Sequence, residues 1–159
     1  MKFKKFAKAA MPDGLLFEKS DPTGQYFERW LFDGSAAMRV PPNVKCMNEG
    51  TVRTMPGNLK DLIEEETMTD ECKLVRAEMP EADGTIKTVR RIFRSEDHKM
   101  EIPIYHADWT LLDKSDVTYI VFKYSEDLEA VPLAIQVLQY PKNPADEPEV
   151  VGIILPVED

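Results

Sequence analysis

The stretches 117-VTYIVFKY-124, 132-PLAIQVLQY-140 and 150-VVGIILPV-157 decide the class of this fold. In the first stretch Val117, Tyr119 and Val121 alternate with Thr118, Ile120 and Phe122. In the second, large apolar residues alternate with smaller or polar neighbours, as a pleated strand with one buried face requires. Acidic and proline-containing segments separate the three runs. The end of the chain therefore predicts three consecutive strands.

The same pattern extends toward the beginning of the chain. Strands are predicted at Leu15–Lys19, Gln25–Phe32 and Ser35–Val40. The Asp33-Gly34 dipeptide between the last two predicts a hairpin with a type I′ turn, because aspartate and glycine both tolerate the positive φ that this turn needs. After the break at Pro56-Gly57, a helix is expected.

Asn58 is expected to cap this second helix, whose apolar stripe is Leu59, Leu62 and Ile63. A helical turn is predicted at Asp108–Leu112. Shorter strands are predicted at Thr51–Met55, Lys73–Met79, Thr85–Phe93 and Met100–Tyr105, with a second hairpin turn at Asp83-Gly84.

Hairpin-length links without long crossovers favour antiparallel sheet with helices packed on one face. The predicted fold is α+β, a sheet-rich single domain over residues 1–159 with two to three helices on one face of the sheet. A chain of 159 residues is long enough for one core and short for two full-sized domains.

Composition limits the class further. The chain is 43% hydrophobic and 31% charged, and no apolar run reaches the roughly 18 to 20 residues that a spanning helix needs. Lysines interrupt the apolar residues of the first ten positions, so we expect no secretory signal, no membrane association and a cytoplasmic location. Cys46 and Cys72 have no CxxC partner and are predicted to be reduced thiols.

Charge is distributed unevenly along the chain. The net charge is −9, but the first ten residues carry four lysines and no acid, so subtracting +4 leaves −13 on the other 149 residues. Apolar residues at helical spacing predict an amphipathic helix here, with the lysines on its other side. This helix is either an ordinary solvated surface helix or a phosphate-facing one. Its candidate binding residues are Lys2, Lys4, Lys5 and Lys8.

Catalytic signatures are not found in this sequence. It contains no GxSxG, phosphate-binding P-loop or GxGxxG pattern. His98 and His106 would lie roughly 26 Å apart across an extended strand, and Glu64, Glu65 and Glu66 would point about 100° apart on a helix. We therefore expect no enzyme, no metal site and no cofactor, although carboxylates that only the fold brings together would escape this reasoning.

Several segments resemble the DNA sliding clamps, or processivity factors. The segment 30-WLFDGSAAMRVP-41 is similar to a clamp hairpin, 56-PGNLKDLI-63 to the entry of the second clamp helix, and 131-VPLAI-135 with 153-IILPV-157 to the closing strands. The resemblance implies helices that face duplex DNA, sheets that face outward, and a role in DNA replication of a bacterium or phage. Because the chain holds about one such domain and its second helix is acidic, encircling DNA would require an oligomer.

Two hypotheses for function follow from the sequence. The first is a non-enzymatic, clamp-like protein that binds duplex DNA through its N-terminal helix. The second is a structural, assembly or adaptor protein that makes protein contacts only, including self-association through edge strands.

Overall fold

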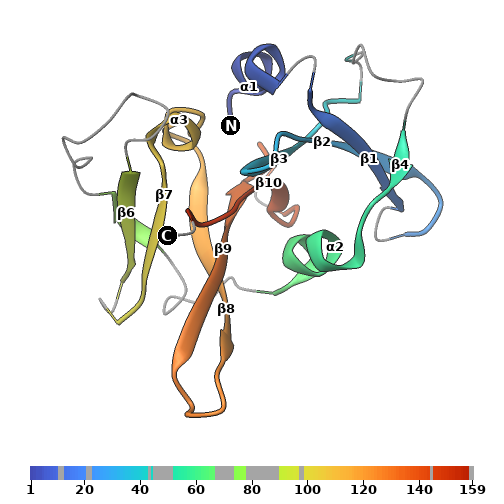
Figure 1. Cartoon of the computed structure of the whole chain (residues 1–159). Helices are drawn as coiled ribbons and strands as arrows, with labels where there is room; N and C mark the ends of the chain where they lie inside the picture. The colour runs from blue at the N-terminus through green and yellow to red at the C-terminus, as the bar shows by residue number, and fades with distance from the viewer. Residues whose placement is uncertain are drawn as a thin grey trace.

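The computed structural model describes residues 1–10, 13–20, 23–42, 44, 52–66, 74–77, 90–96, 99–143 and 145–157. They form a seven-stranded sheet of order β4-β1-β2-β3-β10-β9-β8 and a three-stranded sheet of order β5-β6-β7 (Figure 1). The helices are α1 (Phe3–Ala10), α2 (Gly57–Glu64) and α3 (His106–Trp109). The strands are β1 (Leu15–Ser20), β2 (Phe27–Phe32), β3 (Ala36–Arg39), β4 (Arg53–Thr54), β5 (Leu74–Ala77), β6 (Arg90–Ser95), β7 (Glu101–Tyr105), β8 (Val117–Tyr124), β9 (Ala130–Gln139) and β10 (Glu149–Ile154).

The predicted α+β class is confirmed. The three C-terminal strands are neighbours in the large sheet, paired antiparallel as β8–β9 and β9–β10. β10 also pairs antiparallel with β3, so the C-terminal strands and the N-terminal strands belong to one sheet. Among the described residues the one parallel pairing is β1 with β4, which makes the large sheet mixed.

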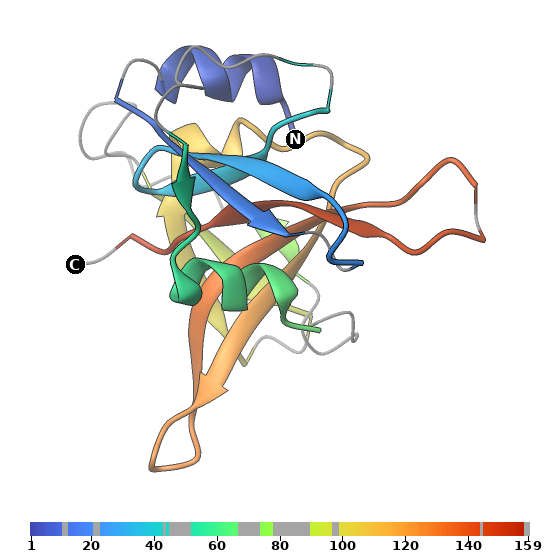
Figure 2. The ribbon, with the colours of Figure 1, turned by 90° about the vertical axis from the view of Figure 1, so that its right-hand side faces the viewer.

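The placement of the two longer helices differs from the expectation of one shared face. Phe6 of α1 packs in a core with Leu16 and Leu31, whereas Leu59 of α2 packs in a second core with Trp30. Neighbouring strand residues point to opposite faces, so the two helices lie on opposite sides of the large sheet (Figure 2).

The physical reason lies in consecutive buried residues of the central strands. Trp30 and Leu31 in β2, and Ile153 and Ile154 in β10, are all fully buried. A strand that is apolar on both faces needs cover on both faces. α1 and α2 therefore cannot both lie on the one DNA-facing side of the sheet that the clamp resemblance implies.

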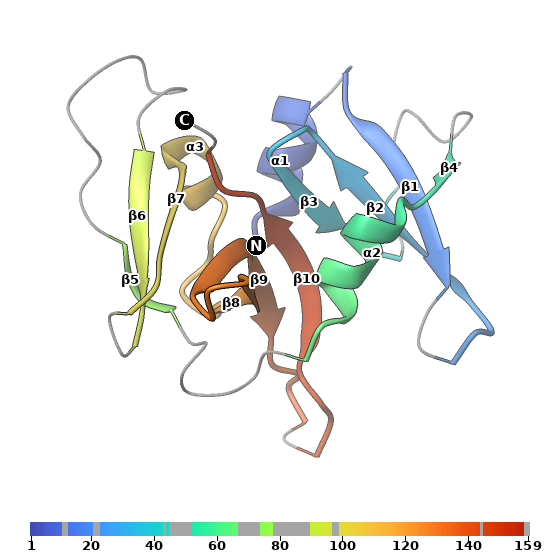
Figure 3. The same ribbon diagram turned by 60° about the horizontal axis from the view of Figure 1, so that its bottom comes forward.

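The small sheet covers the same side of the large sheet as α1. Ile102 and Ile104 of β7 share a core with Phe6 and with Ile120 of the large sheet. The Val157 N–H donates to the Pro103 carbonyl at 2.8 Å, which ties the C-terminal segment to β7. Figure 3 shows the resulting arrangement, with β6 and β7 standing beside the large sheet and α3 at their end.

Several local predictions need correction. Only Gly34 in the β2–β3 turn has a positive φ, at 103°, so the turn is not type I′. Instead the Asp33 carboxylate accepts hydrogen bonds from the N–H groups of Ser35, at 2.9 Å, and Ala36, at 2.8 Å. This side chain replaces a backbone turn as the organiser of the hairpin.

Helix boundaries also shift. α2 begins at Gly57 after Pro56, and Asn58 bonds the N–H of Leu59 from inside the helix, so it is not the cap. The helical turn expected at Asp108–Leu112 begins earlier, at His106. The predicted turn at Asp83-Gly84, residues 85–89 of a predicted strand, both cysteines and His98 lie outside the described residues.

No helix within the described ranges combines the length and apolar character needed to cross a membrane.

Candidate nucleic-acid interface

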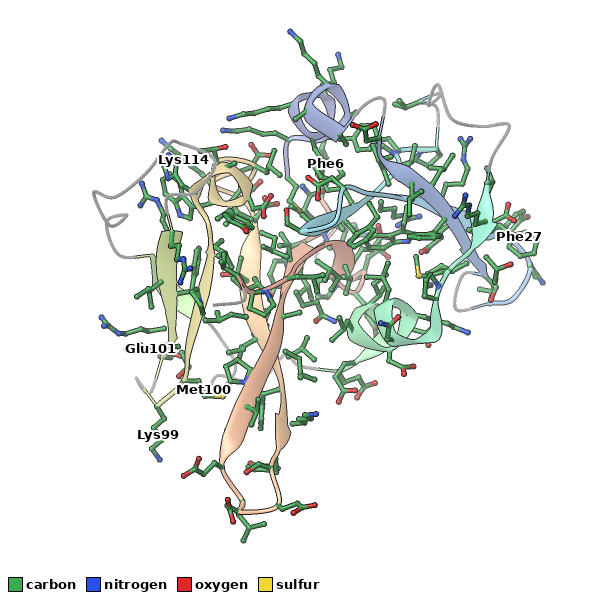
Figure 4. All side chains as sticks on the ribbon, in the orientation of Figure 1. Phe6, Phe27, Lys99, Met100, Glu101 and Lys114 are labelled. Carbon is green, nitrogen blue, oxygen red and sulfur yellow. The ribbon has the colours of Figure 1, made fainter. Side chains whose placement is uncertain are left out.

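The predicted amphipathic helix is present as α1, and its lysines share the solvent side. Phe6 and Ala10 are buried against the sheet, and Phe3 and Ala7 are half-buried. Figure 4 shows Phe6 directed into the molecule and long side chains projecting outward from α1. The exposed residues here include every lysine that the sequence singled out: Lys2, Lys4, Lys5 and Lys8.

Both ends of α1 are held by the rest of the fold. The Met1 ammonium is buried and pairs with the Asp116 carboxylate at 2.7 Å, and with Asp113 at 3.3 Å. At the other end the Gly14 N–H donates to the Ala10 carbonyl at 2.7 Å. A side chain at Gly14 would approach this carbonyl and Leu31 to about 3.1 Å, which explains the glycine. The lysines therefore project from an anchored helix.

α3 lies beside α1 and extends its polar surface. Lys5 Nζ donates to Thr110 Oγ1 at 2.9 Å, and Lys2 Nζ lies 3.4 Å from the Thr110 carbonyl oxygen. Neither contact neutralises a lysine, because both acceptors are uncharged. Lys4 and Lys8 form no hydrogen bond or ion pair with the residues that the structure describes.

Arg91 of β6 adds a fifth cation next to α3. Its guanidinium lies 3.5 Å from the centroid of the Trp109 ring, and its Nε donates to His106 Nδ1 at 2.9 Å. The His106 and Trp109 rings stack with centroids 5.6 Å apart. These contacts hold Arg91 in a fixed orientation, as cation–π and hydrogen-bond partners together do.

His106 itself is not a cation at neutral pH. Partial burial lowers its pKa below the usual 6.5, and the charges of Arg91 and Lys5 lower it further. A neutral ring is also what lets Nδ1 accept the Arg91 hydrogen bond. Desolvation also lowers the pKa of Arg91, but the guanidinium stays charged because an arginine side chain is not deprotonated in proteins.

We call Lys2, Lys4, Lys5, Lys8 and Arg91 the basic face. Of the carboxylates around it, Asp116 and Asp113 are paired with the terminal ammonium, and Asp108 of α3 is buried. Four exposed ammonium groups and one half-buried guanidinium are suited to phosphate oxygens, which bind such groups through charge-assisted hydrogen bonds.

A group of acidic side chains lies on the opposite side of the large sheet. A pocket of about 800 Å³ there lies between α2, β1 and the segment before β10. Lys19 is buried in it and pairs with Glu28 at 3.4 Å and with Glu64 of α2 at 3.8 Å. The carboxylates that line it are Glu28, Glu64, Glu66, Asp146, Glu147 and Glu149. α2 is therefore poorly suited to face phosphate.

Within the described ranges, no group of three or more histidine, cysteine or acidic side chains is arranged to hold a metal ion. His106, which the sequence places at a strand end, begins α3 and contacts Arg91 and Trp109. Sequence reasoning missed Arg91 and Trp109 as members of the site. Their only signals were a basic end to one strand and an aromatic residue in a predicted helical turn.

Comparison of the chain with protein-family models, with curated proteins and with solved structures finds no match.

Proposed function

We propose that this protein is a non-catalytic binding protein that contacts the phosphate backbone of duplex DNA through its basic face. The observation that supports this most directly is the separation of charge. Three lysines project from the solvent side of anchored α1, Lys2 directly precedes it and Arg91 lies beside α3, while the acidic pocket lies across the sheet. The resemblance to sliding clamps supports a place in DNA replication of a bacterium or phage, in the cytoplasm.

The chemistry of the basic face predicts the kind of binding. Lysine contacts to phosphate carry no base information, so recognition is independent of sequence. The net charge of −9 repels DNA from the remaining surface, so the complex forms at low salt and weakens steeply as salt rises. The protein then works best where a partner or a second copy holds it near DNA.

Fluorescence anisotropy with a labelled duplex at low salt tests this proposal. Lys4→Glu with Lys8→Glu should abolish binding, because the two lysines have no competing partner among the described residues. Lys123→Glu with Lys142→Glu is the matched control, since both are exposed, lie outside the basic face and change the net charge by the same amount. Binding that is absent in the unsubstituted protein, or that both variants lose equally, contradicts the proposal.

The alternative function, an adaptor that makes protein contacts only, predicts no DNA binding even at the lowest salt. The same titration therefore separates the two functions.

A further inference from the structure

His106 lies beside the basic face and is held there as a hydrogen-bond acceptor. Its Nδ1 accepts the hydrogen bond from Arg91 Nε at 2.9 Å, and only an imidazole without a proton on Nδ1 can do so. This contact therefore places the proton of the neutral ring on Nε2. A second proton would go to Nδ1, where it would meet the N–H of Arg91.

Two cations lie close to the ring. Figures 1 and 3 show α3 beside α1 and at the end of β7. The titratable groups on these elements and on β6 that adjoin His106 are Arg91, Lys5, Tyr105 and Asp108. Arg91 and Lys5 act on the ring through their charges, and Asp108 is buried. No carboxylate of the described residues forms an ion pair with the His106 ring, so its neighbours oppose a positive charge there.

Trp109 is the neighbour that favours a charged ring. The two rings stack with centroids 5.6 Å apart and planes 20° from parallel, and the face of an aromatic ring attracts positive charge. His106 is half-buried, so solvent and a ligand can reach it. A protonated His106 thus has one favourable contact in the protein and lacks only a counter-charge.

A bound phosphate supplies that counter-charge. Lys5 and Arg91 belong to the basic face, so a phosphate held by either cation lies close to the imidazole. An opposite charge within about 4 to 6 Å stabilises the charged form of a titrating group. The protonated ring also gains an N–H donor, and hydrogen bonds between a charged donor and phosphate are among the strong ones.

We propose that His106 takes up a proton from solvent when the basic face binds phosphate, and so becomes a sixth cation of this face. The protonated ring can no longer accept from Arg91, so the Arg91 Nε–H can turn to phosphate as well. DNA binding is therefore tighter at acidic pH. This inference rests on the proposed function, because it concerns the regulation of the same surface.

Proton linkage makes the proposal quantitative. If duplex DNA raises the pKa of His106, protonation must strengthen duplex binding by the same free energy. Each unit by which the pKa rises corresponds to at most about tenfold between the affinities at low and at high pH.

Heteronuclear NMR of isotope-labelled protein measures the proton uptake directly, because the chain has only two histidines. His106→Gln identifies the His106 signal, since glutamine offers Arg91 an uncharged acceptor and does not ionise. In the free protein this signal should titrate with a midpoint below pH 6.5, and a saturating duplex at low salt should raise the midpoint by about one unit. An unchanged midpoint in the complex overturns the proposal.

A measurement without DNA checks the arrangement of charges. Lys5→Gln should raise the midpoint of His106 in the free protein, because it removes one of the two opposing charges. Lys4→Gln is the matched control, since it makes the same change of charge on the same helix and should leave His106 unaffected. Equal midpoints in the two variants contradict the charge arrangement on which the proposal depends.

Fluorescence anisotropy with a labelled duplex at pH 5.5 and at pH 8 measures the consequence for binding. Asp108 and other groups also take up protons in this range, so the unsubstituted protein is compared with His106→Gln, which shares them. The ratio of the association constants at the two pH values should be at least about threefold larger for the unsubstituted protein. At pH 5.5 its salt slope should also be steeper than that of the variant, by up to about 0.9.

The outcomes separate this inference from the function on which it rests. His98→Gln, which removes the other histidine, should behave like the unsubstituted protein. Binding whose pH dependence is the same with and without His106 overturns the inference and leaves the proposed function standing. A protein that binds no duplex at either pH overturns both.

Discussion

Asp108 should make the stability of this protein fall as pH rises. The residue is 4% exposed in α3, and its Oδ2 has no hydrogen-bond partner among the described residues. Burial raises its pKa from the ordinary 3.8 to about 6; a hydrogen bond from Ser35 opposes this shift and the charge of Asp33 adds to it. The folded protein therefore holds the Asp108 proton over a pH range in which the unfolded chain has lost it.

The sign and size follow from proton linkage. Above about pH 3.8 the Asp108 carboxyl ionises in the unfolded chain while it stays protonated in the folded protein. Ionisation therefore stabilises the unfolded state, and the free energy of unfolding falls until the folded carboxyl also ionises near pH 6. A shift of about two units corresponds to about 3 kcal/mol in full, of which about 1.4 kcal/mol lies between pH 5 and pH 8. Above that range the contribution is constant.

Urea denaturation of the unsubstituted protein and of Asp108→Asn at both pH values measures this effect. Asparagine has similar shape and does not ionise, so the stability of the variant relative to the parent should increase by about 1.4 kcal/mol from pH 5 to pH 8. Taking the difference between the two proteins cancels every other titrating group that the substitution leaves unchanged. A difference that does not change with pH would refute the reasoning about Asp108.

Two further substitutions test the packing and the turn chemistry. Gln136 is fully buried, and its Nε2 lies 3.0 to 3.1 Å from the carbonyl oxygens of Leu62, Ile63 and Glu65 at the end of α2. Gln136→Leu leaves these acceptors without their donor. It should lower the free energy of unfolding, measured by chemical denaturation, by about 1 to 3 kcal/mol. A loss below about 0.5 kcal/mol would show that α2 does not depend on this amide. Leu128→Gly should raise the free energy of unfolding of the monomer by about 1 kcal/mol, since it relieves the positive φ; a lower midpoint in dilute solution would contradict that assignment.

The sequence allowed the strands and the first helix to be predicted because their signals are local. The alternation in Val117–Tyr124 and the spacing of the apolar residues around Phe6 each lie within a few residues, and the structure has both elements at those positions. The side of the sheet on which each helix packs was predicted wrongly. The consecutive apolar residues Trp30 and Leu31 indicate the correct arrangement, because a strand with apolar side chains on both faces must be packed against other elements on both sides of the sheet.

Only part of the candidate site could be predicted from the sequence. The lysines of α1 stand close together in the chain, so their common side follows from helical geometry. Arg91 and Trp109 are separated from α1 by more than eighty residues and reach it only through the packing of β6 and α3. The Asp33 turn was missed for a different reason, because a side-chain acceptor replaced the backbone conformation that the dipeptide favours.

The salt dependence of duplex binding tests the central claim most directly. If the five cations of the basic face each neutralise one phosphate, the logarithm of the association constant should fall against the logarithm of salt concentration with a slope of about −4.5. Lys4→Ala with Lys8→Ala should reduce that slope by about 2, whereas Lys123→Ala with Lys142→Ala should leave it unchanged. An unsubstituted protein that shows no binding at low salt, or a slope that the α1 substitutions do not alter, would contradict a phosphate-binding role for this helix.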